Sequence, residues 1–171
     1  MNPENRNRIL AGLKDAILTE QTGNNFYTVA SQNTADEQGK EVFLMLAAEE
    51  ALHQKWLKEQ YGLLQQGKSP EPLISTDSGA ILDDQSPIFS PELRQRIAEA
   101  HWEMTALSVG LQLEHATIAR YRDLAAESDS PELKHFFEKL MHWEEGHARA
   151  LEQQSKLLRE AYWSEARFAP F

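Results

Sequence analysis

The sequence predicts an all-α protein, an antiparallel four-helix bundle made of two helical hairpins that a long crossover joins. Four long segments repeat apolar residues in alternating steps of three and four, the spacing of one buried helix face. Short polar links separate the first segment from the second and the third from the fourth. Between the two pairs, residues 67–89 are rich in Pro, Ser, Asp and Gly, which is typical of a crossover and not of a third hairpin.

The first predicted helix covers residues 3–32. Asn2 is a good N-cap residue, and a proline follows it. Proline suits the first helical position because the N–H that it lacks would have no partner within the helix there. A short link at Asn33 leads to the second predicted helix, 35–66, so the two helices form an antiparallel hairpin. Thr34, with a glutamate three residues later, is typical of a capping box at the start of this helix.

The third and fourth helices are predicted at 91–127 and 131–160. Ser90 and Ser130 each precede a proline and are therefore expected to cap these helices. The short link between the two helices predicts a second antiparallel hairpin, and residues 161–171 are expected to form a C-terminal tail.

Composition favours one small protein without nucleic-acid or membrane partners. The 171 residues are enough for one core, so 1–171 is expected to be a single domain. A formal net charge of −10 argues against binding to nucleic acid. The chain has no cysteine, which excludes disulfides and thiolate metal centres. The start lacks the apolar run of a signal peptide, and no stretch approaches the length of a membrane span, so a cytoplasmic protein is expected.

Each predicted helix has a glutamate in the middle of its apolar stripe, where a core residue would be expected. In the second and fourth helices a histidine follows three residues later, so each helix presents an oxygen and a nitrogen ligand on one face. The two Glu-x-x-His pairs lie 94 residues apart, and another glutamate precedes each pair by 30 residues. The six residues are Glu20, Glu50, His53, Glu114, Glu144 and His147.

Four carboxylates in one buried layer would repel each other and lose their hydration, so a cation between them is expected. Two divalent ions would balance the four glutamates while both imidazoles stay neutral. Mixed carboxylate and imidazole ligands suit iron or manganese, whereas calcium and magnesium favour oxygen alone and structural zinc favours thiolate. The sequence therefore predicts two iron ions, with manganese or a mixed pair as the alternative, and a purely structural core without metal as the competing interpretation.

The two halves of the chain look like a duplication. A shift of 94 residues aligns the candidate ligands, Tyr27 with Tyr121, and several apolar residues of the stripes. The apolar pairs are Leu13 with Leu107, Phe43 with Phe137, Leu46 with Leu140, and Leu57 with Leu151. Nearly all the matches lie on the stripes, as two-fold pseudosymmetry about a shared central site would leave them.

On these residues the chain resembles the ferritin-like di-iron carboxylate proteins, and most of all the rubrerythrin group without a rubredoxin domain. The run of Glu20, Gly23, Phe26 and Tyr27 is similar to the rubrerythrin pattern of a ligand glutamate, a glycine and a Phe-Tyr pair. The resemblance covers about residues 5–158.

The resemblance implies roles for the six residues, as metal ligands and as the catalytic set. Glu50 and Glu144 would bridge two metals. Glu20 and His53 would complete one metal, and Glu114 and His147 the other. Tyr27 and Tyr121 would hydrogen-bond to ligand carboxylates, although both could equally be core aromatics with a polar tip near water.

Two departures from the family pattern are visible. Rubrerythrins usually have a further glutamate one turn after the third-helix ligand, and here that position is Thr117. The remaining set of four glutamates and two histidines is nearer to bacterioferritin, whose haem-ligating methionine is replaced here by Ala51. The rubredoxin centre is also absent, so electrons would come from a separate donor protein or a small reductant.

The resemblance implies an oxidoreductase that reduces peroxide or dioxygen, and a homodimer is expected. One alternative is a ferroxidase or iron-storage subunit of a ferritin-like shell, for which the ten or so residues after the last helix are too short to form a fifth helix. The other is a metal-binding bundle without turnover.

Other polar residues and motifs favour plain interpretations. Glu49 and Glu145, next to the candidate ligands, are expected on solvated faces, with an iron entry path as the minor alternative. His101, His115, His135 and His142 are expected at the surface. Residues 62–69 fit the phosphate-binding pattern G-x-x-x-x-G-K-[ST], but a helix and not a strand is predicted before them and prolines follow, so Gly67 is interpreted as a helix stop.

Overall fold

The described part of the chain, residues 2–71, 87–97 and 100–165 of a computed structural model, folds into helices alone, which confirms the predicted all-α class. It contains α1 (Pro3–Asn33), α2 (Glu37–Gln65), α3 (Pro91–Gln95), α4 (His101–Glu127) and α5 (Pro131–Glu165). Most of the predicted crossover and the end of the predicted tail lie outside these residues. No described helix has an apolar stretch that could cross a membrane.

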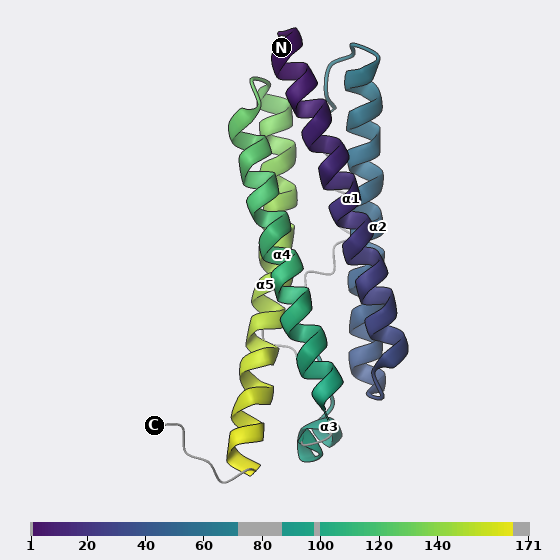
Figure 1. The fold of residues 1–171 in the computed structure, drawn as a ribbon, viewed down its shortest axis with the longest axis vertical. Helices are drawn as coiled ribbons and strands as arrows, with labels where there is room; N and C mark the ends of the chain where they lie inside the picture. The colour runs from purple at the N-terminus through teal and green to yellow at the C-terminus, as the bar shows by residue number, and fades with distance from the viewer. Residues whose placement is uncertain (1, 72–86, 98–99, 166–171) are drawn as a thin grey trace.

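Two antiparallel hairpins lie side by side in the bundle (Figure 1). Helix α1 packs along α2, helix α4 packs along α5, and α1 also contacts α4. Helix α2 ends at one end of the bundle and α3 begins at the other (Figure 1). The link between them therefore joins opposite ends, as predicted for a crossover between two hairpins.

Three of the four predicted N-caps are confirmed. Asn2, Ser90 and Ser130 each accept a hydrogen bond from the backbone N–H three residues later, at 2.8, 3.2 and 3.4 Å respectively. In each case the side-chain oxygen satisfies a backbone donor that has no partner inside the helix. These three helix starts were therefore predictable from the hydrogen bond that a capping side chain makes.

The predicted capping box at Thr34 is wrong. The N-cap of α2 is Asp36, whose Oδ2 accepts from the Gly39 backbone N–H at 2.9 Å. The Thr34 hydroxyl instead donates to Oε1 of buried Glu103 on α4, at 2.7 Å. A tertiary hydrogen bond to another helix thus competes with the local cap, and α2 begins two residues later than predicted.

The predicted single helix over 91–127 is also wrong, because the structure has the short α3 and then α4, with Arg96 as the C-cap of α3. No proline or glycine marks the break. The residues that surround it, Leu93, Ile97 and Ala100, are buried in the apolar core. We infer that burial of these side chains stabilises the chain more than an unbroken helix would. The local sequence does not indicate this break, because it depends on tertiary packing.

Helix α5 extends to Glu165, five residues beyond its predicted end at 160. The predicted helix stop at Gly67 is confirmed, since its φ of 73° is a conformation that glycine adopts without strain. Lys68 N–H donates to the Leu63 carbonyl at 2.9 Å and Gly67 N–H to the Leu64 carbonyl at 3.1 Å, the pattern of a Schellman motif. The phosphate-loop pattern thus spans a helix end and lacks the strand that phosphate binding requires.

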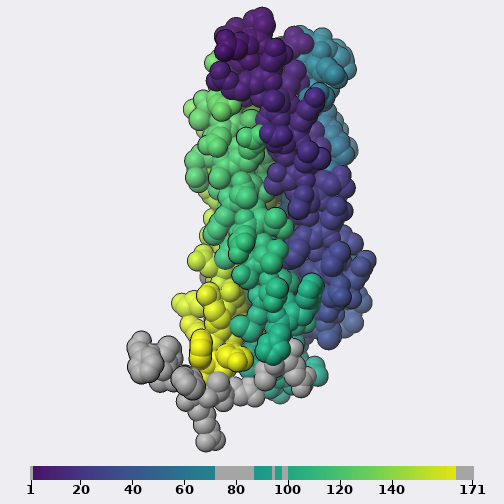
Figure 2. All heavy atoms as spheres, viewed as in Figure 1, coloured from purple at the N-terminus to yellow at the C-terminus, as the bar shows by residue number. Residues whose placement is uncertain are grey.

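Two apolar clusters fill the bundle. The Phe43 cluster includes Tyr27, Phe43, Leu46, Phe89, Ile97, Leu107 and Leu151. The Phe137 cluster includes Ile9, Leu13, Leu57, Leu64, Tyr121, Phe136, Phe137 and Leu140. In the space-filling view α1 and α4 cover one face of the bundle (Figure 2).

Candidate metal centre

The six residues predicted as ligands lie together in the interior of the bundle. Helix α1 contributes Glu20, α2 contributes Glu50 and His53, α4 contributes Glu114, and α5 contributes Glu144 and His147. Each is at most 3% exposed. Four helices therefore direct four carboxylates and two imidazoles into one layer, as their positions on the apolar stripes predict.

The ligand atoms form two overlapping groups, which are Glu20, Glu50, His53 and Glu144, and Glu50, Glu114, Glu144 and His147. Within each group one ligand atom from every residue lies within 4.8 Å of the others. Glu50 and Glu144 belong to both groups. The arrangement can therefore hold two ions that share two carboxylates.

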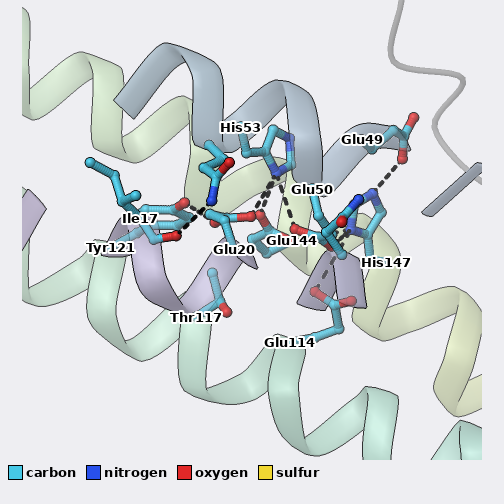
Figure 3. Close-up of polar contacts among 12 residues, drawn as sticks. Ile17, Glu20, Glu49, Glu50, His53, Glu114, Thr117, Tyr121, Glu144 and His147 are labelled. Carbon is cyan, nitrogen blue, oxygen red and sulfur yellow. Dashed lines mark hydrogen bonds and ion pairs between the residues drawn. The ribbon is translucent and has the colours of Figure 1, made fainter. Parts of the chain in front are cut away.

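Both imidazoles present Nδ1 to this layer (Figure 3). His53 Nδ1 lies 2.8 Å from Glu144 Oε1, 3.5 Å from Glu20 Oε2 and 3.6 Å from Glu50 Oε2. His147 Nδ1 lies 3.1 Å from Glu144 Oε2, 3.6 Å from Glu50 Oε1 and 3.7 Å from Glu114 Oε2. Each ring therefore faces three carboxylates with the same nitrogen, and its Nε2 points away from the layer.

A buried tyrosine of each hairpin contacts a glutamate of the other. The Tyr27 hydroxyl of α1 donates to Glu114 Oε1 on α4, and the Tyr121 hydroxyl of α4 donates to Glu20 Oε1 on α1. Both tyrosine side chains are fully buried. These bonds orient the two glutamates that belong to only one group each, as the resemblance implies.

Gly23 provides space for one of the shared carboxylates. A Cβ atom at this position would lie 3.3 Å from Glu50 Cγ and 3.4 Å from its carboxyl carbon. Any larger side chain would therefore press on Glu50 from α1. The lack of a side chain at Gly23 thus leaves room for the Glu50 carboxylate.

Burial, and then repulsion by Glu50 and Glu144, raises the pKa of Glu20 and of Glu114 well above the usual carboxyl range. Burial acts in the same direction on Glu50 and Glu144, but contacts with the two imidazoles, and for Glu50 also with Glu20, lower the pKa of both below its ordinary value. Burial alone would lower the pKa of each histidine, yet the surrounding carboxylates raise it well above its usual value. Without metal, these shifts favour protons on Glu20, Glu114 and the two imidazoles and negative charge on Glu50 and Glu144.

Among the described residues, three buried atoms of this layer make no hydrogen bond, namely Glu20 Oε2, His53 Nδ1 and Glu144 Oε1. The last two lie 2.8 Å apart, but without the angles of a hydrogen bond. All three belong to the same ligand group. A buried polar atom without a partner costs about 1–3 kcal/mol, so three at one place indicate a missing partner. A cation bound between the three atoms would satisfy them together, and the residues therefore fit a metal ion.

Glu49 contradicts the prediction of a solvated face. It is only 7% exposed, and its Oε2 lies 2.6 Å from His147 Nε2. A signal for its burial was present, because Leu46, Glu49, Glu50 and His53 follow the i, i+3, i+4, i+7 pattern of a wide buried face. The side chain of Glu145 is 35% exposed and lies near exposed His142, as predicted.

The remaining predictions about single residues agree with the structure. His101, His115, His135 and His142 are exposed. Thr117 is buried one turn after Glu114, and its hydroxyl donates to the Leu113 carbonyl at 3.1 Å. No seventh carboxylate therefore occupies the place where many rubrerythrins have one.

Residues 12–153 match the family model described as Rubrerythrin. The matched region contains all six clustered residues, Glu49 and both buried tyrosines. A search of curated proteins and a search of solved structures each found no match. The family match and the two ligand groups thus agree on the same part of the chain.

Proposed function

Because the chain belongs to the rubrerythrin family of ferritin-like di-iron carboxylate proteins, we propose that it binds two iron ions and reduces peroxide or dioxygen. The observation on which this proposal depends is that Glu50 and Glu144 belong to both ligand groups. In the proposed centre Glu50 and Glu144 would be ligands of both metals. Glu20 and His53 would be the other ligands of one metal, and Glu114 and His147 those of the second.

The ligand chemistry supports iron. Each half offers carboxylate oxygens and one imidazole nitrogen, a mixture that suits iron or manganese better than calcium or magnesium. Two divalent ions supply four positive charges against four glutamates, so the buried layer is balanced when both histidines are neutral. Bound iron ions would displace the protons that the metal-free layer holds.

The protein groups orient the centre and exclude water. Tyr27 and Tyr121 hold Glu114 and Glu20 in place, and the apolar clusters separate the layer from solvent. When bound, the two irons supply the two electrons that reduction of peroxide requires. Since the chain has no cysteine and hence no thiolate iron centre, the electrons to restore the reduced state come from a separate donor.

The test begins with metal-free protein loaded anaerobically with ferrous iron. Metal analysis should give two irons per chain. Addition of hydrogen peroxide should oxidise both irons and consume one peroxide per centre, according to H₂O₂ + 2e⁻ + 2H⁺ → 2H₂O. One iron or none per chain would contradict the dinuclear centre.

The same experiment separates the competing functions. Two bound irons that reduce neither peroxide nor dioxygen would indicate a metal-binding bundle without turnover. Continued uptake of iron far beyond two per chain, with a large shell on size exclusion, would indicate iron storage. Loading with manganese under the same conditions tests which metal the ligand set prefers.

A further inference from the structure

The two halves of the centre have matching ligands but different surroundings. Glu49 on α2 lies against His147 on α5, with 2.6 Å between its Oε2 and the outward-facing Nε2. In Figure 3 it lies beyond the His147 ring, away from Glu20. Only 7% of Glu49 is exposed, so this contact is shielded from water and is not a loose surface pair.

The other histidine, His53, has two tryptophans as neighbours. The shift of 94 residues that aligns the ligands also aligns Glu49 with Trp143 and Trp56 with Ala150. The Trp143 ring centre lies 5.6 Å from that of His53, and the Trp56 ring centre lies 5.8 Å away. Trp143 thus occupies beside His53 the place that Glu49 occupies beside His147.

This difference changes what each imidazole can do as a ligand. A neutral histidine that binds metal through Nδ1 has its proton on Nε2. Glu49 accepts that proton in a hydrogen bond, which fixes the tautomer and the ring orientation of His147 and raises its basicity. Within the described residues, the carboxylate contacts given for His53 all involve Nδ1, and the ring has two indole rings as neighbours.

Glu49 also makes the charge distribution unequal. It adds a buried carboxylate on the side of His147 only, and its partner position is the neutral Trp143. A divalent ion next to Glu114 and His147 is therefore attracted by one more negative group than an ion next to Glu20 and His53. The hydrogen bond to His147 and the added negative charge both favour metal binding in the half with Glu114 and His147.

We propose that Glu49 is a positioning residue that makes the two metal sites unequal, so that the half with Glu114 and His147 binds its ion first and more tightly. This inference rests on the proposed metal centre, and it adds an order of loading that the six ligands alone do not imply. Removal of an outer partner of a metal-bound histidine typically lowers metal affinity by about 10–100-fold.

Cobalt(II) is a suitable probe, because its binding is followed anaerobically by calorimetry and by visible absorption. The metal-free wild-type chain should bind two ions in two resolved steps. In Glu49→Gln the tighter step should weaken by about 10–100-fold while the second step stays within about threefold. Glu145→Gln is the matched control. Glu145 also follows a ligand directly in the sequence, but it contacts His142 and neither ligand histidine, so both binding steps should be unchanged.

Proton NMR of the cobalt-loaded protein gives a second, direct readout. The paramagnetically shifted Nε2 proton of His147 should exchange slowly with solvent in the wild type and in Glu145→Gln. It should exchange faster in Glu49→Gln, whereas the shifted resonances of His53 should stay in place. A loss of packing alone would disturb both halves.

Two outcomes would overturn the inference. Equal affinities for the two ions in the wild type would show that the halves are equivalent, although the metal centre itself would stand. Equal effects of Glu49→Gln and Glu145→Gln on cobalt binding and proton exchange would show that Glu49 does not position His147. Complete absence of cobalt binding by the wild type would instead remove the proposed centre, and this inference with it.

Discussion

The polar layer at the centre of the bundle and the two apolar clusters of the core follow the same pseudosymmetry, but they have opposite effects on the stability of the fold. The 94-residue shift relates the clusters to each other, because each aligned pair has one member in either cluster. These pairs are Leu13 with Leu107, Tyr27 with Tyr121, Phe43 with Phe137, Leu46 with Leu140, and Leu57 with Leu151. The candidate ligands repeat with the same shift and lie together in one layer.

The comparison separates stability from function. Burial of apolar side chains in the two clusters stabilises the fold whether or not metal is bound. The layer opposes folding unless its charges are balanced, by protons on Glu20, Glu114 and the imidazoles or by two cations. We therefore expect changes in the clusters to be independent of metal, and changes in the layer to depend on it.

The largest effect on stability is expected from Phe43→Ala and Phe137→Ala. Both rings are fully buried at equivalent places, so each truncation should lower the free energy of unfolding by about 3–5 kcal/mol. Urea unfolding should give the same loss with and without metal. A loss that differed by several kcal/mol between the two variants would mean that the clusters are not energetically equivalent.

The next largest effect is expected from Glu50→Ala and Glu144→Ala. Either change removes a ligand of both groups, so stable binding of two ions should be abolished and the stabilisation of the protein by metal should be lost. Metal analysis and melting curves with and without iron measure both consequences. Glu145→Ala should retain two ions, and equal damage from it would contradict the assignment of the buried face.

Much of the fold and of the site was predictable because both depend on residues that are buried at regular spacing. The long helices, three N-caps and the six clustered residues followed from the apolar stripes and from local capping chemistry. The break before α4 and the later start of α2 did not. They depend on burial of Ile97 and Ala100 and on the hydrogen bond from Thr34 to Glu103, which are tertiary contacts between segments far apart in sequence.

Glu49 shows a different limit. Its position on the stripe was compatible with burial, but the apolar seam passes through Glu50, and two adjacent glutamates on one helix favour a solvated face for one of them. What buries Glu49 is its contact with His147 of the other hairpin. The partner of a polar residue in a different hairpin becomes visible only when the packing of the helices is known.

A smaller effect, with opposite signs in the two forms, is expected from pH. In the metal-free protein the pKa of Glu20 and Glu114 is raised above 4.5 and that of both histidines above 6.5, so the folded state binds protons that the unfolded chain has released. The free energy of unfolding should therefore rise as pH falls from 8, by at most about 1.4 kcal/mol per pH unit for each group that is protonated only in the folded state. The contribution of the histidines is complete below about pH 6.5, where the unfolded chain binds the same protons, whereas that of the two glutamates continues to grow toward pH 5.

The other two carboxylates limit this range. The lowered pKa of Glu50 and Glu144 contributes stability above 4.5 that is lost as pH falls below it, so the trend should reverse in acid. In the iron-loaded protein, protons compete with metal for the same ligands. The melting temperature of this form should therefore decrease as pH is lowered from 8 to 5. Thermal melts of both forms at several pH values test this, and parallel trends would contradict a shared buried site.

The smallest effect is expected from Tyr27→Phe and Tyr121→Phe. Each ring would still fill its place in its apolar cluster, but Glu114 or Glu20 would lose the hydrogen bond from the tyrosine hydroxyl. The free energy of unfolding should fall by about 1 kcal/mol, and the iron of the affected half should bind about fivefold more weakly. The two variants should act on different halves, because Tyr27 holds the ligand beside His147 and Tyr121 holds the ligand beside His53. Iron titration of each variant would show it, and a weakening of the same binding step in both would contradict the separate ligand groups.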